Sequence, residues 1–189
     1  MTSNGVTQET NLYTITVPPF TKALRALSKI LDKAEAHAAG KASERHPAEK
    51  HQSALLNDRL VFDQFNFTRQ VQVACDNAKL GVARIGALEA PAFPDTEQTF
   101  EELKTRVEKT IAFLESVKPE ALIGKESATV KLPYYKDKHF TAFDYATEYL
   151  IPNFYFHVTT AYSILRKAGV TLGKRDYMGN LTLEDDAAK

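Results

Sequence analysis

The amino-acid sequence predicts an all-α protein: a single four-helix bundle with a small β-hairpin before the last helix. Two observations lead to this fold class. Four long segments place apolar residues at alternating spacings of three and four, which is typical of a helix with one buried face. The connections between these segments have lengths that suit an antiparallel bundle, with room for a crossover.

The first helix is expected directly after Val17, because Pro18 and Pro19 suit the opening turn of a helix, where the missing N–H has no partner. It is expected to end near Gly40. Its buried face is predicted to consist of Phe20, Leu24, Leu27, Leu31, Ala34 and Ala38. Residues 41–56 are polar and are interpreted as a connection that is partly helical.

The second helix is expected from Asp58 to Leu88, and the third follows the prolines of residues 89–94. Asp95 lies three residues before Gln98, which is an acidic variant of the capping arrangement at a helix start. The third helix is expected to end near Lys118. The apolar stripe of the second helix is Val71, Cys75, Ala78, Val82 and Ile85, and that of the third is Phe100, Leu103, Val107, Ile111 and Leu114.

Residues 126–140 predict the hairpin, because β-branched and aromatic residues flank a short polar turn there. The fourth helix is expected from Thr141 to Gly169, with a kink at Pro152, which removes a backbone hydrogen bond. Its stripe is Ala146, Leu150, Asn153, His157, Ala161, Ile164 and Ala168.

Composition excludes several classes of protein. The 24 basic residues balance the 24 acidic ones, which argues against a nucleic-acid or membrane partner. One cysteine excludes an intramolecular disulfide and a multi-thiolate metal site. The first sixteen residues lack the pattern of a signal peptide, so a cytoplasmic location is expected. We expect one domain over residues 1–189, with 1–16 and 182–189 flexible.

His157 and Asn153 are the leading candidates for a functional site, because both polar side chains occupy core positions one helical turn apart. Two interpretations are open: a polar pocket that holds a small ligand or a metal, or a hydrogen-bonded pair that fixes helix register. Gln72 and Asp76 lie at the edge of the buried face of the second helix, and a solvated Asp76 paired with Lys79 is the plainer reading.

Dense aromatic residues on the fourth helix indicate a homodimer surface. Cys75 lies on the stripe of the second helix, where a free thiol usually acts as a small core residue. The remaining four histidines fall at the periphery, in no spacing that would direct two imidazoles at one ion.

The chain resembles the DinB/YfiT-like superfamily, in a bacterial branch known only as a domain of unknown function. The resemblance extends from LYTITVPPF to LGKRDYMG. Its most specific segments are LSKILDKAEAHA, RQVQVACDNAK, FPDTEQTFEELKTRVEKTIAFLE and LIPNFYFHVTTAYSILRKAGVTLGKRDYMG. It implies an up-down-down-up bundle that is usually dimeric. Characterised relatives bind a divalent metal with three histidines, and some are thiol transferases, hydrolases or isomerases.

Carried onto this chain, the resemblance matches His157 with one histidine of the fourth helix, while Asn153 stands where the other would be. The second-helix ligand falls within QVQVACD, where Asp76 and Gln72 are the polar options. We therefore expect a bundle with a polar core pocket around His157, an unidentified small-molecule ligand and no complete three-histidine metal site.

Two alternatives stay open. The first is a divalent-metal-dependent enzyme, a thiol transferase or hydrolase, that uses His157 with Asp76 and Asn153. The second is an interaction module that acts through its dimer surface.

Overall fold

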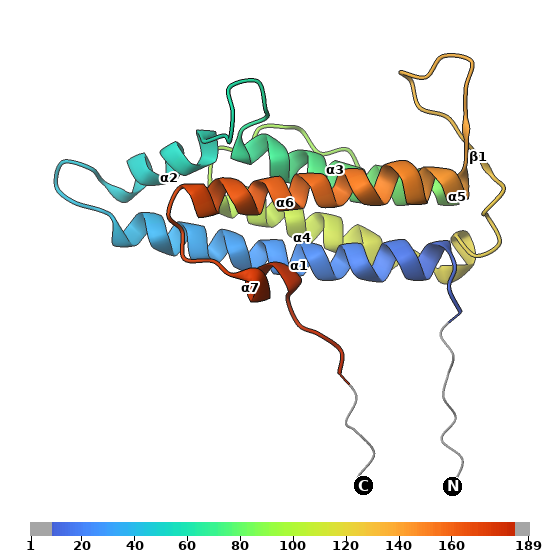
Figure 1. Cartoon of the computed structure of the whole chain (residues 1–189), viewed down its shortest axis with the longest axis horizontal. Coiled ribbons are helices and arrows are strands. Elements are labelled where there is room, and N and C mark those ends of the chain that lie inside the picture. Colours follow the sequence, from blue (N-terminus) through green and yellow to red (C-terminus); the bar gives the residue numbers. More distant parts are fainter. Residues whose placement is uncertain (1–8, 184–189) are drawn as a thin grey trace, which may run out of the picture.

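A computed structural model describes residues 9–183 and shows long helices packed side by side (Figure 1). The helices are α1 Leu12–Gly40, α2 Ala48–Asn57, α3 Phe67–Gly86, α4 Phe100–Ser116, the 3₁₀ turn η1 Pro119–Ala121, α5 Ala142–Asp144, the π-helical segment η2 Tyr145–Leu150, α6 Ile151–Lys167 and α7 Lys174–Met178. Strand β1 (Thr129–Val130) pairs with β2 (Phe140–Thr141) in an antiparallel sheet. The predicted all-α class and its small hairpin are confirmed.

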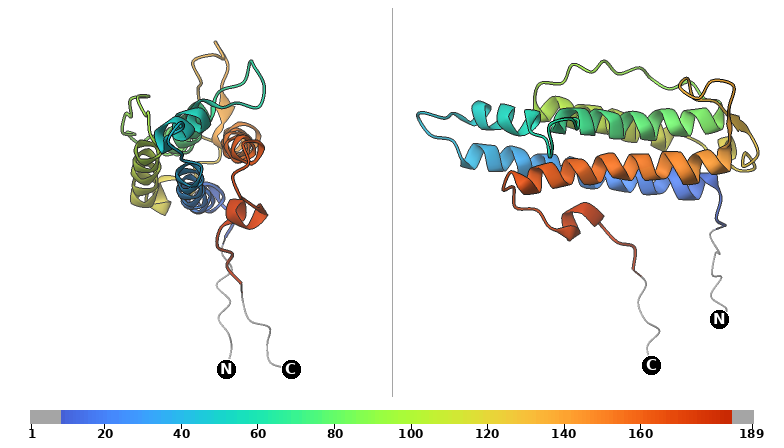
Figure 2. Two further views of the ribbon diagram at one scale, coloured as in Figure 1. Left: turned by 90° about the vertical axis from the view of Figure 1, so that its left-hand side faces the viewer. Right: turned by 45° about the horizontal axis from the view of Figure 1, so that its top comes forward.

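The four long helices follow an up-down-down-up order. Helices α1 and α6 run in one direction and α3 and α4 in the other (Figure 1). Because α3 and α4 are parallel, residues 87–99 must return along the bundle, and Figure 2 shows this crossover lying over its outside. The most extensive helix contacts join α3 with α6 and α1 with α4.

Helix α1 begins before its two prolines, so the expectation that they open it is wrong. Asn11 accepts a hydrogen bond from the Thr14 N–H at 3.0 Å, and the Thr14 hydroxyl accepts one from the Asn11 N–H at 2.9 Å. This capping box starts the helix at Leu12 and leaves Pro18 and Pro19 inside it. Of the termini expected to be flexible, residues 12–16 are therefore helical, whereas 1–8 and 184–189 lie outside the described residues.

The segment expected to form the second helix divides into a loop and a helix. Residues 58–66 form the loop, and α3 begins at Phe67 because the Asn66 side chain accepts a hydrogen bond from the Arg69 N–H at 3.0 Å. The polar connection before it contains α2, as its partly helical reading anticipated. All members of the predicted stripe of α3 are buried.

Helix α4 begins at Phe100, not near Asp95. Thr99 and Glu102 form a reciprocal capping box, in which each side chain accepts from the backbone N–H of the other at 3.1 Å. Asp95 does not cap this helix, because its carboxylate pairs with Arg69 and Arg106.

The fourth helical segment contains one wider, π-helical part just before Pro152. The segment begins where predicted, with Thr141 capping the Asp144 N–H at 3.1 Å, and Gly169 follows its end with a φ of +88°. Residues 145–150 are π-helical, and the Ile151 N–H reaches the Ala146 carbonyl. The wide turn precedes the position where proline lacks an N–H, and such bulges accommodate a missing helical bond.

Within residues 9–183, none of the helices combines the length and the apolar character that crossing a bilayer requires.

Candidate functional site

His157 lies in the seam between α6 and α3, with 7% of its surface exposed. Its Nδ1 is 2.6 Å from Oε1 of Gln70. The Gln70 amide nitrogen donates to the Phe65 carbonyl at 3.2 Å, which turns the amide oxygen toward the imidazole. Because that oxygen can only accept, Nδ1 carries the hydrogen and Nε2 keeps its lone pair.

The surroundings keep this imidazole uncharged. Burial, and secondly the charge of Arg69, lower the pKa of His157 from 6.5 to about 4. The Phe65 ring stacks on the imidazole with centroids 6.5 Å apart, and the Phe156 ring meets it edge-on at 5.2 Å. His157 is therefore a neutral, oriented hydrogen-bond acceptor between two aromatic rings at neutral pH.

A second polar contact crosses the same seam one helical turn away. The Asn153 amide nitrogen donates to Oδ1 of Asn77 at 3.0 Å. The Asn77 amide nitrogen is buried and has no hydrogen-bond partner among the residues the structure describes. The seam between α3 and α6 thus holds two side-chain pairs, Gln70–His157 and Asn77–Asn153.

Gln72 and Asp76 lie on the opposite edge of α3 and do not join this seam. Gln72 donates to Oε2 of Glu97 at 2.8 Å. Asp76 pairs with Lys79 at 3.2 Å, as the plainer reading expected, and also with Arg106 at 3.0 Å. Lys79 is only 2% exposed, so this pair is not a solvated surface contact.

These contacts belong to a cluster of charges that holds the crossover against α3 and α4, which we call the crossover clasp. Its members are Lys79, Arg106, Asp76, Asp95, Glu97 and Phe93. Arg106 pairs with Asp95 and Glu97 at 2.9 Å each, and Lys79 Nζ lies 3.9 Å from the centroid of the Phe93 ring. Burial disfavours the charge of Arg106, but the bond to Glu97 and the nearby Asp76 outweigh it and raise the pKa of Arg106.

Sequence reasoning missed Gln70 and, apart from the Asp76–Lys79 pair, the clasp. Gln70 is one residue before the predicted stripe of α3, and Arg106 directly precedes the inward-facing Val107. The one sequence signal for Gln70 and for Arg106 is that each is a polar residue next to an apolar stripe.

The residues near His157 do not fit the metal site of the resembling superfamily. The polar side chains paired across this seam with His157 and Asn153 are the amides of Gln70 and Asn77, and the oxygens of Gln70 and Asn77 already accept hydrogen bonds. Amide oxygens are poor ligands for the transition metals that imidazole binds. Within residues 9–183, no three His, Cys, Asp or Glu side chains are grouped so that they could hold an ion.

Cys75 does not offer a nucleophile. Its thiol is fully buried, and burial raises the pKa of Cys75 from 9.0 to about 12. It therefore stays protonated at neutral pH and packs as a small core residue, in line with the sequence-based expectation.

Comparisons with known proteins agree on the family and the fold. Residues 12–178 match the family model described as "Domain of unknown function (DUF1993)". The chain is also similar to the crystal structure of a DinB family member protein from Shewanella denitrificans. The identity is 41%, the match covers 93% of this chain and 96% of that chain, and the TM-score is 0.85. No protein with a curated description matches the chain.

Proposed function

Because the chain belongs to the DUF1993 family, a DinB-like family without an assigned function, we propose a function from the α3–α6 seam. His157 binds a small ligand as a neutral hydrogen-bond acceptor. The observation that carries this proposal is the bond from Nδ1 of His157 to Gln70. It fixes the tautomer and the ring orientation, and it leaves the Nε2 lone pair for a ligand N–H or O–H group.

The electrostatics of the site favour binding over proton abstraction. A general base works best when its pKa lies near the operating pH, and the pKa of His157, about 4, is far below neutrality. A neutral acceptor in a largely apolar setting still gives a directional hydrogen bond. The proposal therefore assigns recognition, and no chemical step, to His157.

The two phenylalanines indicate what else the ligand would contact. Phe65 and Phe156 flank the imidazole and are 51% and 53% exposed. Exposed aromatic faces favour a planar, mostly apolar molecule, since offset or edge-on ring contacts add to simple burial. A planar ligand with one O–H or N–H donor fits this combination.

Phenol is a suitable probe, because it offers one donor on a planar ring. In ¹⁵N-labelled protein we expect phenol to shift the Nε2 resonance of His157 and to leave the Nδ1–H intact. Phenol should also shift the resonances of backbone amides near His157. His157→Gln should abolish these amide shifts, whereas His37→Gln, which replaces a histidine of α1 distant from His157 in the sequence, should not. Equal binding by wild type and His157→Gln would refute the proposal.

Elemental analysis tests the metal-dependent alternative. A stoichiometric transition metal that survives dialysis and is lost in His157→Gln would favour that alternative and overturn the ligand-binding proposal.

A further inference from the structure

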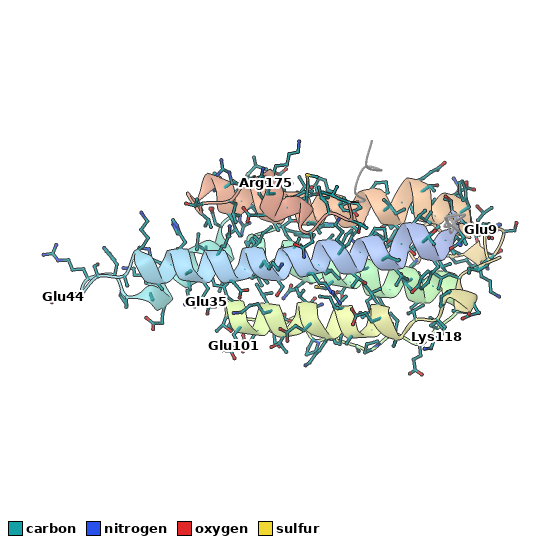
Figure 3. The ribbon with its side chains drawn as sticks, turned by 90° about the horizontal axis from the view of Figure 1, so that it is seen from below. Glu9, Glu35, Glu44, Glu101, Lys118 and Arg175 are labelled. Atoms are coloured by element: carbon teal, nitrogen blue, oxygen red, sulfur yellow. The ribbon has the colours of Figure 1, made fainter. Side chains whose placement is uncertain are left out.

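Two adjacent hollows lie along α1, on the face where α7 packs. The first has a volume of about 450 Å³ and is bounded by α1, Tyr155 of α6 and Tyr177 of α7. The second, of about 660 Å³, lies between α1, α4 and the segment after α7. Pro18 and Lys22 line both, so the two hollows adjoin along one helix. Figure 3 looks at this face and shows α1 between α4 and the helices α6 and α7.

The first hollow has an apolar lining and a fixed wall. Pro19, Ala23, Tyr155 and Met178 contribute to the lining. The Tyr177 hydroxyl lies 2.8 Å from the Thr159 hydroxyl, which holds α7 against α6. An apolar body of moderate size can therefore pack against this wall without unfolding any element.

One of the two prolines of α1 leaves a hydrogen-bond acceptor beside this hollow. Pro18 has no N–H, so the Thr14 carbonyl lacks the donor that a helix normally supplies four residues later. Thr14 lines the first hollow. A ligand with an N–H or O–H beside its apolar body would meet an acceptor on this wall.

The second hollow is basic. It is lined by Lys22, Arg25 and Lys29 and by one acidic residue, Glu108. Arg25 pairs with Glu115, but neither lysine forms an ion pair within residues 9–183.

A polar group in the same hollow also lacks a partner. The Thr21 hydroxyl is buried and makes no hydrogen bond within the described part of the chain. A negatively charged group in this hollow would provide the two lysines with a counter-charge.

We propose that the two hollows form one binding site for an amphipathic anion. The apolar body occupies the first hollow beside Tyr155, and a carboxylate or sulfonate lies in the second between Lys22 and Lys29. The ligand class is an organic acid with an aromatic or aliphatic body. This site shares none of its lining residues with the His157 seam, so its test is independent of the proposed function.

The fluorescent probe 8-anilinonaphthalene-1-sulfonate has the three required features: an aromatic body, an N–H and a sulfonate. We expect the full-length chain to bind one molecule with a rise in fluorescence. Ala23→Met fills the first hollow and should abolish this binding, whereas Ala36→Met, on the exposed side of the same helix, should leave it unchanged.

Charge reversal tests the second hollow. Lys22→Glu should weaken probe binding at least threefold, and this loss should shrink in about 1 M salt, where the Debye length falls to about 3 Å. Lys109→Glu reverses an exposed lysine of α4 outside both hollows and serves as the control. Circular dichroism checks that each variant is folded.

Competition separates the two kinds of ligand. Displacement by dodecanoate would identify an aliphatic acid, and displacement by 1-naphthoate alone would identify an aromatic one. The proposal is overturned if the probe does not bind, if Ala23→Met binds it as the wild type does, or if neither acid displaces it.

Discussion

Replacing Arg106 by methionine tests whether the crossover clasp stabilises the fold. The side chain is 1% exposed and forms ion pairs with Asp76, Asp95 and Glu97 around it. Methionine has a similar length but no charge, so it leaves these carboxylates without their shared partner. We expect a large loss of stability with no change of fold.

The magnitude follows from which carboxylates can reach water. Removing one partner of a buried ion pair costs about 3–5 kcal/mol. Asp76 and Asp95 are 28% and 40% exposed and can be rehydrated, whereas Glu97 is only 10% exposed. We therefore expect the lower end of that range, about 3 kcal/mol. In a chain of this size that loss lowers the melting temperature by roughly 6–12 °C.

Urea denaturation followed by circular dichroism measures this change, since the midpoint should fall while the m-value stays constant. Arg25→Met is the matched control. It breaks the Arg25–Glu115 pair, whose side chains are 62% and 48% exposed, and such pairs contribute about 0.2–1 kcal/mol. If Arg106→Met loses no more stability than Arg25→Met, the clasp does not stabilise the fold and the reasoning is refuted.

Three further predictions use single sites. The pKa of His157 is about 4 in the folded chain and 6.5 in the unfolded one, so the unfolded chain binds a proton first as pH falls. The free energy of unfolding should therefore decrease between about pH 6.5 and about pH 4, by at most about 3 kcal/mol, and urea titrations of His157→Gln should lack this decrease. Cys75, with its pKa raised to about 12, should resist a thiol-specific reagent in the native protein and react in urea; rapid labelling of the native chain would contradict its burial. At Gly81 an added Cβ would lie 2.2 Å from Cδ1 of Leu150, so Gly81→Ala should lower stability by about 1–3 kcal/mol. Gly40→Ala, where a Cβ meets nothing within 4 Å, should not lower stability, and equal thermal shifts for the two variants would refute the contact.

The partner of His157 could not be predicted from helical periodicity. Each residue advances about 100° around a helix, so Gln70 and Gln72 lie at equal angles on either side of Val71. The apolar pattern of the helix therefore does not indicate which of these two glutamines faces α6. The packing of α6 on one edge and of the crossover on the other breaks that symmetry, and it directs Gln70, not Gln72 or Asp76, to His157.

The starts of α1 and α4 were predicted wrongly, because tertiary packing or capping outweighed the local sequence signal. Pro18 and Pro19 are strong helix-start residues, yet Leu12 and Thr16 before them are almost fully buried and hold the earlier turns in the helix. Asp95 has the right spacing for a cap, but Arg106 binds it. The apolar stripes, by contrast, were largely predictable, because the burial of a helix face depends mainly on its own residues.

The crossover also determines how the chain reaches its folded state. The two largest helix interfaces, α3 with α6 and α1 with α4, each join a helix before residues 87–99 to one after them. Neither half of the chain therefore contains its own principal packing surfaces. A ribosome-bound chain that has released only α1, α2 and α3 lacks the partners of two of those helices. Cooperative folding should then wait until α6 has emerged, because only then can both principal interfaces form.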